Sequence, residues 1–550
     1  MTLSRRVPAV AVVVALGCGT VISASRFDRR APAPLRAAPG APAPARFTRS
    51  QEPPRRSVPE LPPRYALRGE DGLVRAYEFI LDSRFDQVDS ELRRACGPAP
   101  PEACNVLDAT ALWWRIQLDP ENHGLDAAFS ASVERAIRTA EAWTERAPQD
   151  AEAWFYLGGA YGARVQWRVL RGEKVAAARD GKQIKEAMER AIELEPGLDD
   201  AYFGLGMYKY YADVAPAAAR FLRFLLLLPG GDRKEGLREM LRARSRGRLV
   251  QGEADFQLHV IYLWYERQTR RAIELLRGLQ ARYPGNPLYL ASIAQIQDVY
   301  DHDIIASLET WRALLAAARE QRANNAALAE VQARLGAARM LEAVCLTDDA
   351  IEQLKAVTAL KPQAPYSSLA LAYLRLGEAH DRVGARSAAL SAYKSALSAV
   401  PTLDPYDVRG QAAEHLRRGP DARAADAYRL SLEGWRRLEK NDLPGATAAL
   451  ERAVTLNAQD PVARYRLGRV LQARRDDVAA LAQFDLSIRN GRTCPAPILG
   501  NAHLEAARLH ERLGHKDDAL SAYRIASTLF GAAEDTRSTA ARALARLTAR

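Results

Sequence analysis

Apolar side chains recur three and four residues apart through most of this chain, the spacing that places them on one face of a helix. The clearest stretch runs Tyr373-x2-Leu376-Gly377-x2-His380, then Ala389-x3-Tyr393-x2-Ala396-x4-Pro401. Its small residues fall where two helices must approach each other closely. The apolar-polar alternation typical of strands is rare. The pattern therefore predicts helices arranged in consecutive pairs.

The same pattern returns along the chain, for example in Trp154-x2-Leu157-Gly158-x2-Tyr161 and in two second helices whose Ala446 and Ala480 are 34 residues apart. It resembles the tetratricopeptide repeat (TPR), which has a period of 34 residues and the signature W-x2-LG-x2-Y, A-x3-F, P. The chain is similar to exported bacterial TPR proteins. The resemblance covers most of residues 65–530. It implies an all-α fold, an α-solenoid of helix-turn-helix (TPR-like) repeats wound into a right-handed superhelix.

The pattern divides the chain into six segments. They are a signal peptide or lipoprotein signal (1–24), a disordered Pro/Ala/Arg-rich linker (25–64), divergent N-terminal helical pairs (65–148), TPR-like repeats with inserted helices (149–345), C-terminal TPR repeats (346–532) and a capping helix (533–550).

Two insertions interrupt the array. Trp154 and Pro196 are 42 residues apart where the repeat predicts 28, so about fourteen residues are inserted around 165–181. Residues 217–228 form an apolar run that contains two arginines and is too short to span a bilayer. This run is either a buried packing helix or a helix that binds a membrane interface or a partner.

The N-terminus has the features of an export signal, with Arg5 and Arg6 before a short apolar stretch. Ala15-Leu16-Gly17-Cys18 partly matches a lipoprotein box, which would make Cys18 a lipidation site. The alternatives are cleavage after Ser23 or Ala24 and an uncleaved anchor. We therefore expect an exported protein, periplasmic or anchored to the membrane through its N-terminus.

The net charge of +11 is concentrated at the N-terminus. Residues 1–64 hold eleven arginines against three carboxylates, which accounts for eight of the eleven excess positive charges. The rest of the chain is nearly neutral, so a basic face for nucleic acid is not expected.

The cysteines predict one structural bond and no metal site. Cys96 and Cys104 bracket a Pro-rich turn and could form a disulfide in an oxidising compartment. Cys345 follows a helical pattern and is predicted to be a buried apolar residue. None of the cysteines has the spacing of a zinc motif.

The sequence contains no recognisable motif for catalysis, for a cofactor or for a metal. Leu157-Gly158-Gly159-Ala160-Tyr161-Gly162 lacks the Lys-Ser/Thr ending of a phosphate loop. His510 and His515 are five residues apart, so their rings are expected to diverge, and Gly514 is expected to mark a turn. Asp301-His302-Asp303 is expected to be a solvated loop. We therefore expect neither a cofactor nor an enzyme.

In TPR proteins the first helix of each pair lines the concave groove, and this resemblance predicts the partner-binding residues. In the earlier repeats they are largely aromatic: Phe155, Phe203, Met207, Tyr210, Tyr211, Ile261, Trp264 and Tyr265. In the later repeats they are mostly charged: Glu378, Asp381, Arg382, Tyr465, Arg469, Gln472, Arg508, Glu511 and Arg512. Exposed aromatic residues suit peptide binding. The alternative is that residues 217–228 fill the first half of the groove and make its aromatic residues core.

The sequence thus favours a non-catalytic TPR scaffold in the bacterial cell envelope that mediates protein–protein interaction or assembly. Its ligand would be a protein or peptide, and its oligomeric state is open. The alternative is a membrane-surface structural or biogenesis factor that uses the 217–228 apolar helix. An enzyme with an unrecognised site is the third possibility.

Overall fold

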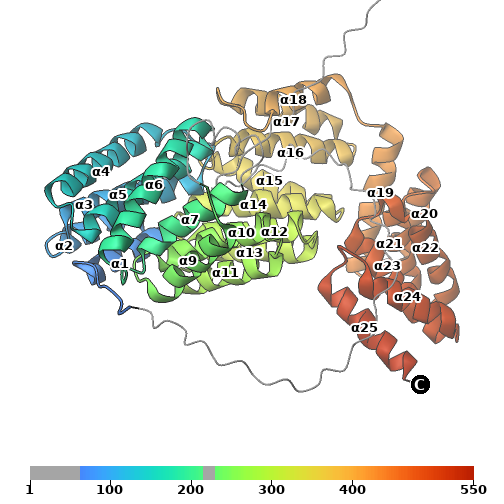
Figure 1. Ribbon diagram of the computed structural model, residues 1–550. Coiled ribbons are helices and arrows are strands. Elements are labelled where there is room, and N and C mark those ends of the chain that lie inside the picture. Colours follow the sequence, from blue (N-terminus) through green and yellow to red (C-terminus); the bar gives the residue numbers. More distant parts are fainter. Residues whose placement is uncertain (1–61, 215–229, 550) are drawn as a thin grey trace, which may run out of the picture.

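The computed structural model describes residues 62–214 and 230–549, and most of them are helical (Figure 1). These residues include no strand. The helices follow one another in pairs joined by short turns, so the all-α fold and the solenoid of TPR-like repeats are confirmed.

The helices of the larger, N-terminal group are α1 (Glu70–Leu81), α2 (Phe85–Ala95), α3 (Pro101–Leu118), α4 (Asp126–Arg146), α5 (Ala151–Leu170), α6 (Lys174–Leu194), α7 (Ala201–Val214), α9 (Arg233–Arg246), α10 (Gln251–Trp264), α11 (Thr269–Arg282), α12 (Pro287–Val299), α13 (Ile304–Arg319), α14 (Ala326–Ala343), α15 (Thr347–Leu360), α16 (Ser368–Arg382), α17 (Arg386–Ala399) and α18 (Val408–Arg417). The C-terminal group contains α19 (Ala422–Glu439), α20 (Leu443–Leu456), α21 (Pro461–Ala473), α22 (Asp477–Arg489), the short 3-10 helix η2 (Gly491–Thr493), α23 (Ala496–Arg512), α24 (Lys516–Thr528) and α25 (Glu534–Thr548).

The glycine of the repeat signature is required by close packing within a pair. A Cβ atom on Gly377 of α16 would lie 2.4 Å from a ring carbon of Tyr393 on α17, and one on Gly468 of α21 would lie 2.7 Å from a ring carbon of Phe484 on α22. Both aromatic rings are fully buried. The glycine thus makes room for the large second-helix residue, which explains why the two positions recur together in the sequence.

The insertion predicted around 165–181 lengthens a helix pair. α5 and α6 continue through it and are joined by a turn at Gly172, whose φ of 81° suits glycine. The apolar run 217–228, the N-terminal segment 1–24 and Cys18 lie outside the described residues.

The N-terminal pairs pack across the array onto helices far along the chain. The Tyr77 hydroxyl (α1) and the Trp114 indole N–H (α3) both donate to Glu253 on α10, each at 3.0 Å. The Tyr289 hydroxyl (α12) donates to the Leu81 carbonyl at 3.0 Å, and the Gln332 amide (α14) donates to the Leu118 carbonyl at 3.1 Å. One hydrophobic core therefore runs from α1 to α12, with the side chains of α3 inside it.

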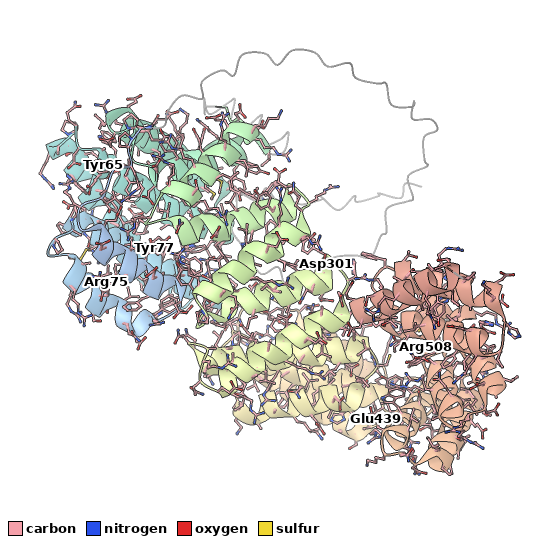
Figure 2. The ribbon with its side chains drawn as sticks, turned by 90° about the horizontal axis from the view of Figure 1, so that it is seen from below. Tyr65, Arg75, Tyr77, Asp301, Glu439 and Arg508 are labelled. Atoms are coloured by element: carbon pink, nitrogen blue, oxygen red, sulfur yellow. A yellow bond between two sulfur atoms is a disulfide. The ribbon has the colours of Figure 1, made fainter. Side chains whose placement is uncertain are left out.

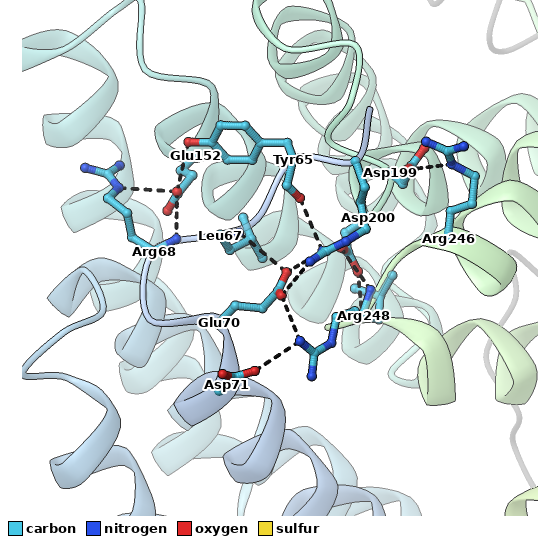
Figure 3. Close-up of polar contacts among 12 residues, drawn as sticks. Tyr65, Leu67, Arg68, Glu70, Asp71, Glu152, Asp199, Asp200, Arg246 and Arg248 are labelled. Carbon is cyan, nitrogen blue, oxygen red and sulfur yellow. Dashed lines mark hydrogen bonds and ion pairs between the residues drawn. The ribbon is translucent and has the colours of Figure 1, made fainter. Parts of the chain in front are cut away.

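The segment before α1 is fixed to this body by buried carboxylates (Figure 3). The Glu70 carboxylate accepts hydrogen bonds from both terminal guanidinium nitrogens of Arg64, at 2.6 and 2.8 Å. The Glu152 carboxylate accepts one from the backbone N–H of Arg68, at 2.9 Å. Asp199, which is fully buried, pairs with Arg246 at 2.8 Å. Buried charges are stable only when they are paired. These ion pairs and hydrogen bonds therefore make the segment before α1 part of the folded array.

The helices α19–α25 form a second group beside the first (Figure 1). Figure 2 places Tyr77 within the N-terminal group and Arg508 within this C-terminal group. The two groups meet where the Thr347 and Tyr428 hydroxyls lie 2.7 Å apart and where Arg466 donates to the Cys345 carbonyl at 2.6 Å. The ring of His302 also contacts that of Phe530, with 5.2 Å between their centroids.

Cys96 and Cys104 are joined in a disulfide that closes the turn between α2 and α3. The prediction for Cys345 was wrong, because this residue lies in the turn after α14 with φ of 59° and is only half-buried. No helix in the described parts of the chain is both long and apolar enough to cross a membrane.

Candidate partner-binding surface

The aromatic positions predicted in the first half belong mainly to the core. Phe155, Tyr210, Tyr211 and Ile261 are each at most 5% exposed. The four others, Phe203, Met207, Trp264 and Tyr265, are half-buried and pack against the same core. For the four buried residues the groove interpretation is wrong, because their side chains are removed from solvent.

The physical reason is that the first half of the solenoid is filled by its own N-terminal helices. Trp114 of α3 is fully buried, and its ring centroid is 4.8 Å from that of Phe256 on α10 and 6.4 Å from that of Tyr289 on α12. Among the first helices, α10 therefore contacts α1 and α3, and α5 and α12 contact α3. The alternative that residues 217–228 also fill the groove stays a prediction, because they lie outside the described residues.

A buried carboxyl group lies at the centre of this packing. Besides Tyr77 and Trp114, Glu253 accepts the amide N–H of Gln257 at 3.0 Å. Burial raises the pKa of Glu253 above its usual range, which favours the protonated acid. The three donors satisfy the group without a charged partner, so this cluster is a structural element of the core.

The rings of Tyr210, Tyr211 and Tyr265 meet edge-to-face, with centroids 5.6 to 5.9 Å apart. The Tyr210 hydroxyl donates to Glu266 at 2.6 Å, and Glu266 also pairs with Arg233 at 2.6 Å. These contacts join the C-terminal ends of α7 and α10 to the start of α9. The cluster is thus explained by packing between helix pairs.

In the second half, a row of polar and aromatic side chains follows consecutive first helices. We call it the polar row; its members are Glu342 on α14, Arg382 on α16, Tyr428 and Trp435 on α19, Tyr465, Arg466, Arg469 and Gln472 on α21, and Glu505 and Arg508 on α23. Each helix in the row contacts the next through at least one of these residues.

The contacts at the start of the row combine ion pairs with rings. Arg382 pairs with Glu342 at 2.7 Å, and its guanidinium lies 5.8 Å from the ring centroid of Tyr428. The guanidinium of Arg466 lies 5.8 Å from the ring centroid of Trp435. Arg466 is 3% exposed and has no carboxylate within ion-pair distance among the described residues. Burial therefore lowers its pKa.

The far end of the row is held by hydrogen bonds. Arg469 donates to the Tyr465 hydroxyl at 3.1 Å. Glu505 accepts from Gln472 at 2.8 Å and from Arg508 at 2.7 Å. The row contains four arginines and two carboxylates, so it carries a surplus of positive charge.

The sequence located only part of this surface. Arg382, Tyr465, Arg469, Gln472 and Arg508 were predicted from the repeat and lie in the row. The remaining predicted positions of the second half are used in other contacts: Asp381 accepts from Tyr393 at 3.0 Å, Glu378 pairs with Arg375 at 2.8 Å, Glu511 pairs with Arg546 at 2.7 Å and Arg512 pairs with Asp477 at 2.9 Å.

Five members of the row were not predicted: Glu342, Tyr428, Trp435, Arg466 and Glu505. For Trp435 a signal exists in the sequence, because it follows the signature glycine Gly434 directly. Tyr428 and Arg466 enter the row through the meeting of the two helix groups, and Glu342 enters it through its ion pair with Arg382. The repeat pattern does not encode these contacts.

No protein-family model and no curated protein matches this chain. Several solved structures resemble it at low identity. A Rap protein complexed with competence and sporulation factor is 13% identical, with 87% of this chain and 99% of that chain covered and a TM-score of 0.32. Yeast Tom70 is 11% identical, with 88% and 96% covered and a TM-score of 0.25. The TPR2AB domain of yeast Sti1 is 16% identical, with 54% and 96% covered and a TM-score of 0.19. This chain is TPR-like through its own helix pairs and their glycine contacts.

Proposed function

We propose that this chain is a non-catalytic TPR-like scaffold that binds an extended segment of a partner protein on the polar row. The observation that carries the proposal is the division of the array. The first half uses its first helices to build a core, whereas α16, α19, α21 and α23 of the second half carry Arg, Trp and Tyr side chains. Of these, Tyr465 and Arg466 are buried, and the others are half-buried or exposed. These three residue types dominate binding energy at protein interfaces.

The charge of the row favours an acidic partner segment. Arg382 and Arg508 are each 46% exposed, and Arg469 donates to a neutral hydroxyl. Guanidinium groups bind carboxylates through paired hydrogen bonds, and the rings beside them can stack on backbone or apolar side chains. The row runs along successive helices, so an extended peptide fits it better than a compact ligand.

Peptide binding tests this proposal directly. A labelled Glu-rich peptide and its Gln-substituted counterpart are titrated by fluorescence anisotropy against the wild type and the triple variant Arg382→Ala, Arg469→Ala, Arg508→Ala. The control is Arg452→Ala, which removes an exposed arginine from a second helix, α20. We expect the wild type and R452A to prefer the Glu-rich peptide, and the triple variant to bind it at least about tenfold more weakly. Equal binding by the triple variant would refute the assignment of the row as the binding surface.

We further propose that the protein acts in the bacterial cell envelope, anchored by its N-terminus. The export pattern of residues 1–24 supports this setting, and so does the pairing of Cys96 with Cys104, since disulfides persist in oxidising compartments. Fractionation of cells that express the wild type or Cys18→Ala, with labelled fatty acid, tests the anchor. Membrane recovery and label incorporation that are unchanged in C18A would eliminate lipidation of Cys18.

A further inference from the structure

Two histidines that are five residues apart in the sequence come together at the last repeat. α23 ends at Arg512, and Gly514, with φ of 82°, turns the chain so that His515 precedes α24. The Nδ1 atoms of His510 and His515 are 3.3 Å apart. The expectation that the two rings diverge was therefore wrong: the turn at Gly514 was expected, but it brings the rings together.

A carboxylate completes the cluster. Asp518, in the first turn of α24, places Oδ2 4.0 Å from Nδ1 of His510. One ligand atom from each of His510, His515 and Asp518 lies within 4.8 Å of the other two. His510 is held by the helix and is 16% exposed, whereas His515 and Asp518 are exposed. An ion could thus enter from solvent and meet one ligand that is already fixed.

The geometry suits a transition-metal ion. Zn²⁺ binds imidazole nitrogen at about 2.0–2.1 Å in a tetrahedral arrangement, so two such ligands are about 3.3 Å apart. This is the separation of the two Nδ1 atoms. The Asp518 oxygen, 4.0 Å from Nδ1 of His510, needs to come about 0.7 Å closer to that atom to reach the same spacing, and rotation of an exposed Asp side chain permits this. Two imidazoles and one carboxylate form a donor set for Zn²⁺ and other late first-row ions.

We propose that His510, His515 and Asp518 bind a divalent transition-metal ion of the Zn²⁺ type, with water completing the coordination. The ion would join the end of α23 to the start of α24 and hold the last hairpin closed. This proposal does not depend on the function of the polar row. The rival interpretation is a hydrogen bond between two neutral imidazoles, with one ring donating and the other accepting.

Metal titration of the full, untagged chain separates the two interpretations. After treatment with chelator, Zn²⁺ is added in a calorimetric titration, and Co²⁺ is added in parallel because its visible absorption reports coordination. We expect one ion bound per chain and a midpoint of thermal unfolding that rises with Zn²⁺ concentration.

Three variants and one matched control make the test specific. His510→Ala and His515→Ala should each weaken Zn²⁺ binding by more than about 100-fold, and Asp518→Asn should weaken it less. His515 and Asp518 are exposed, so their replacement should leave the circular dichroism spectrum and the metal-free unfolding midpoint unchanged. The control is His123→Ala, because His123 and Asp126 also form a histidine–carboxylate pair, at 3.5 Å, but without a second imidazole.

Two results would overturn the proposal. One is the absence of saturable Zn²⁺ and Co²⁺ binding by the wild type. The other is binding that H515A retains or that H123A loses to the same extent. Either result would assign the contact between the two rings to a hydrogen bond alone.

Discussion

The replacement of Trp114 by Ala tests whether the N-terminal helices fill the solenoid. Trp114 is fully buried on α3, contacts Phe256 and Tyr289, and donates to Glu253 at 3.0 Å. Truncation of a buried Trp costs about 3–5 kcal/mol through lost burial and the cavity left behind. Loss of the donor removes one of three hydrogen bonds to Glu253, which adds about 1 kcal/mol.

The cost should appear in helices that are remote from α3 in the sequence. Native-state hydrogen exchange, read by mass spectrometry, measures the local free energy of opening. In W114A the protection of α10 and α12 should fall by about three to four orders of magnitude, because the two costs total about 4–6 kcal/mol and each 1.36 kcal/mol is a factor of ten. Protection of α21 and α23 should be unchanged, because those helices belong to separate hydrophobic clusters.

A matched control is Trp154→Ala, because the Trp154 ring is half-buried and its indole N–H donates to the Pro148 carbonyl at an exposed edge. We expect W154A to lower the free energy of unfolding by about 1–2 kcal/mol, because the Trp154 side chain is only partly buried. Unchanged protection of α10 and α12 in W114A would show that α3 does not support them. The first half would then be open to a ligand, contrary to the packing described above.

Two further predictions concern the same N-terminal body. The raised pKa of Glu253 means that the folded state binds its proton more tightly than the unfolded state. Its contribution to stability is therefore complete below the unfolded pKa of about 4.3 and is lost as the pH rises through the folded pKa. Glu253→Gln removes this pH dependence. The midpoint of thermal unfolding of the variant, relative to that of the wild type, should therefore increase as the pH is raised from acid to neutral. The exposed Glu451→Gln should show no such trend, and a constant difference between E253Q and the wild type would contradict the argument. The Cys96–Cys104 disulfide closes a loop with a sequence separation of 8. Cys96→Ser with Cys104→Ser should therefore cost about 2.5 kcal/mol of local stability at α2 and α3 in hydrogen exchange, a value worked from loop length alone. Equal protection in the reduced and oxidised wild type would refute this estimate.

The sequence alone determined the elements of this protein and their pairing. Gly377 and Tyr393, or Gly468 and Phe484, recur at fixed spacing because each glycine makes room for the aromatic ring of its own second helix. That contact is local to one repeat, and local contacts leave a periodic signal. The capping helix predicted over 533–550, which is α25, followed from the same kind of signal.

Only the tertiary structure decided what the first helices do. Phe155, Tyr210 and Ile261 have the pattern of groove residues, yet they are buried. α1 packs onto α10, about 170 residues later in the chain, and Tyr210 is covered by Tyr211, Tyr265 and Glu266. The repeat pattern also did not predict the contact between His510 and His515. A single turn at Gly514 places their Nδ1 atoms 3.3 Å apart. A repeat pattern records the contacts inside each pair. It does not record how far the solenoid closes on itself, since that depends on the sum of small rotations between pairs and on contacts distant in sequence.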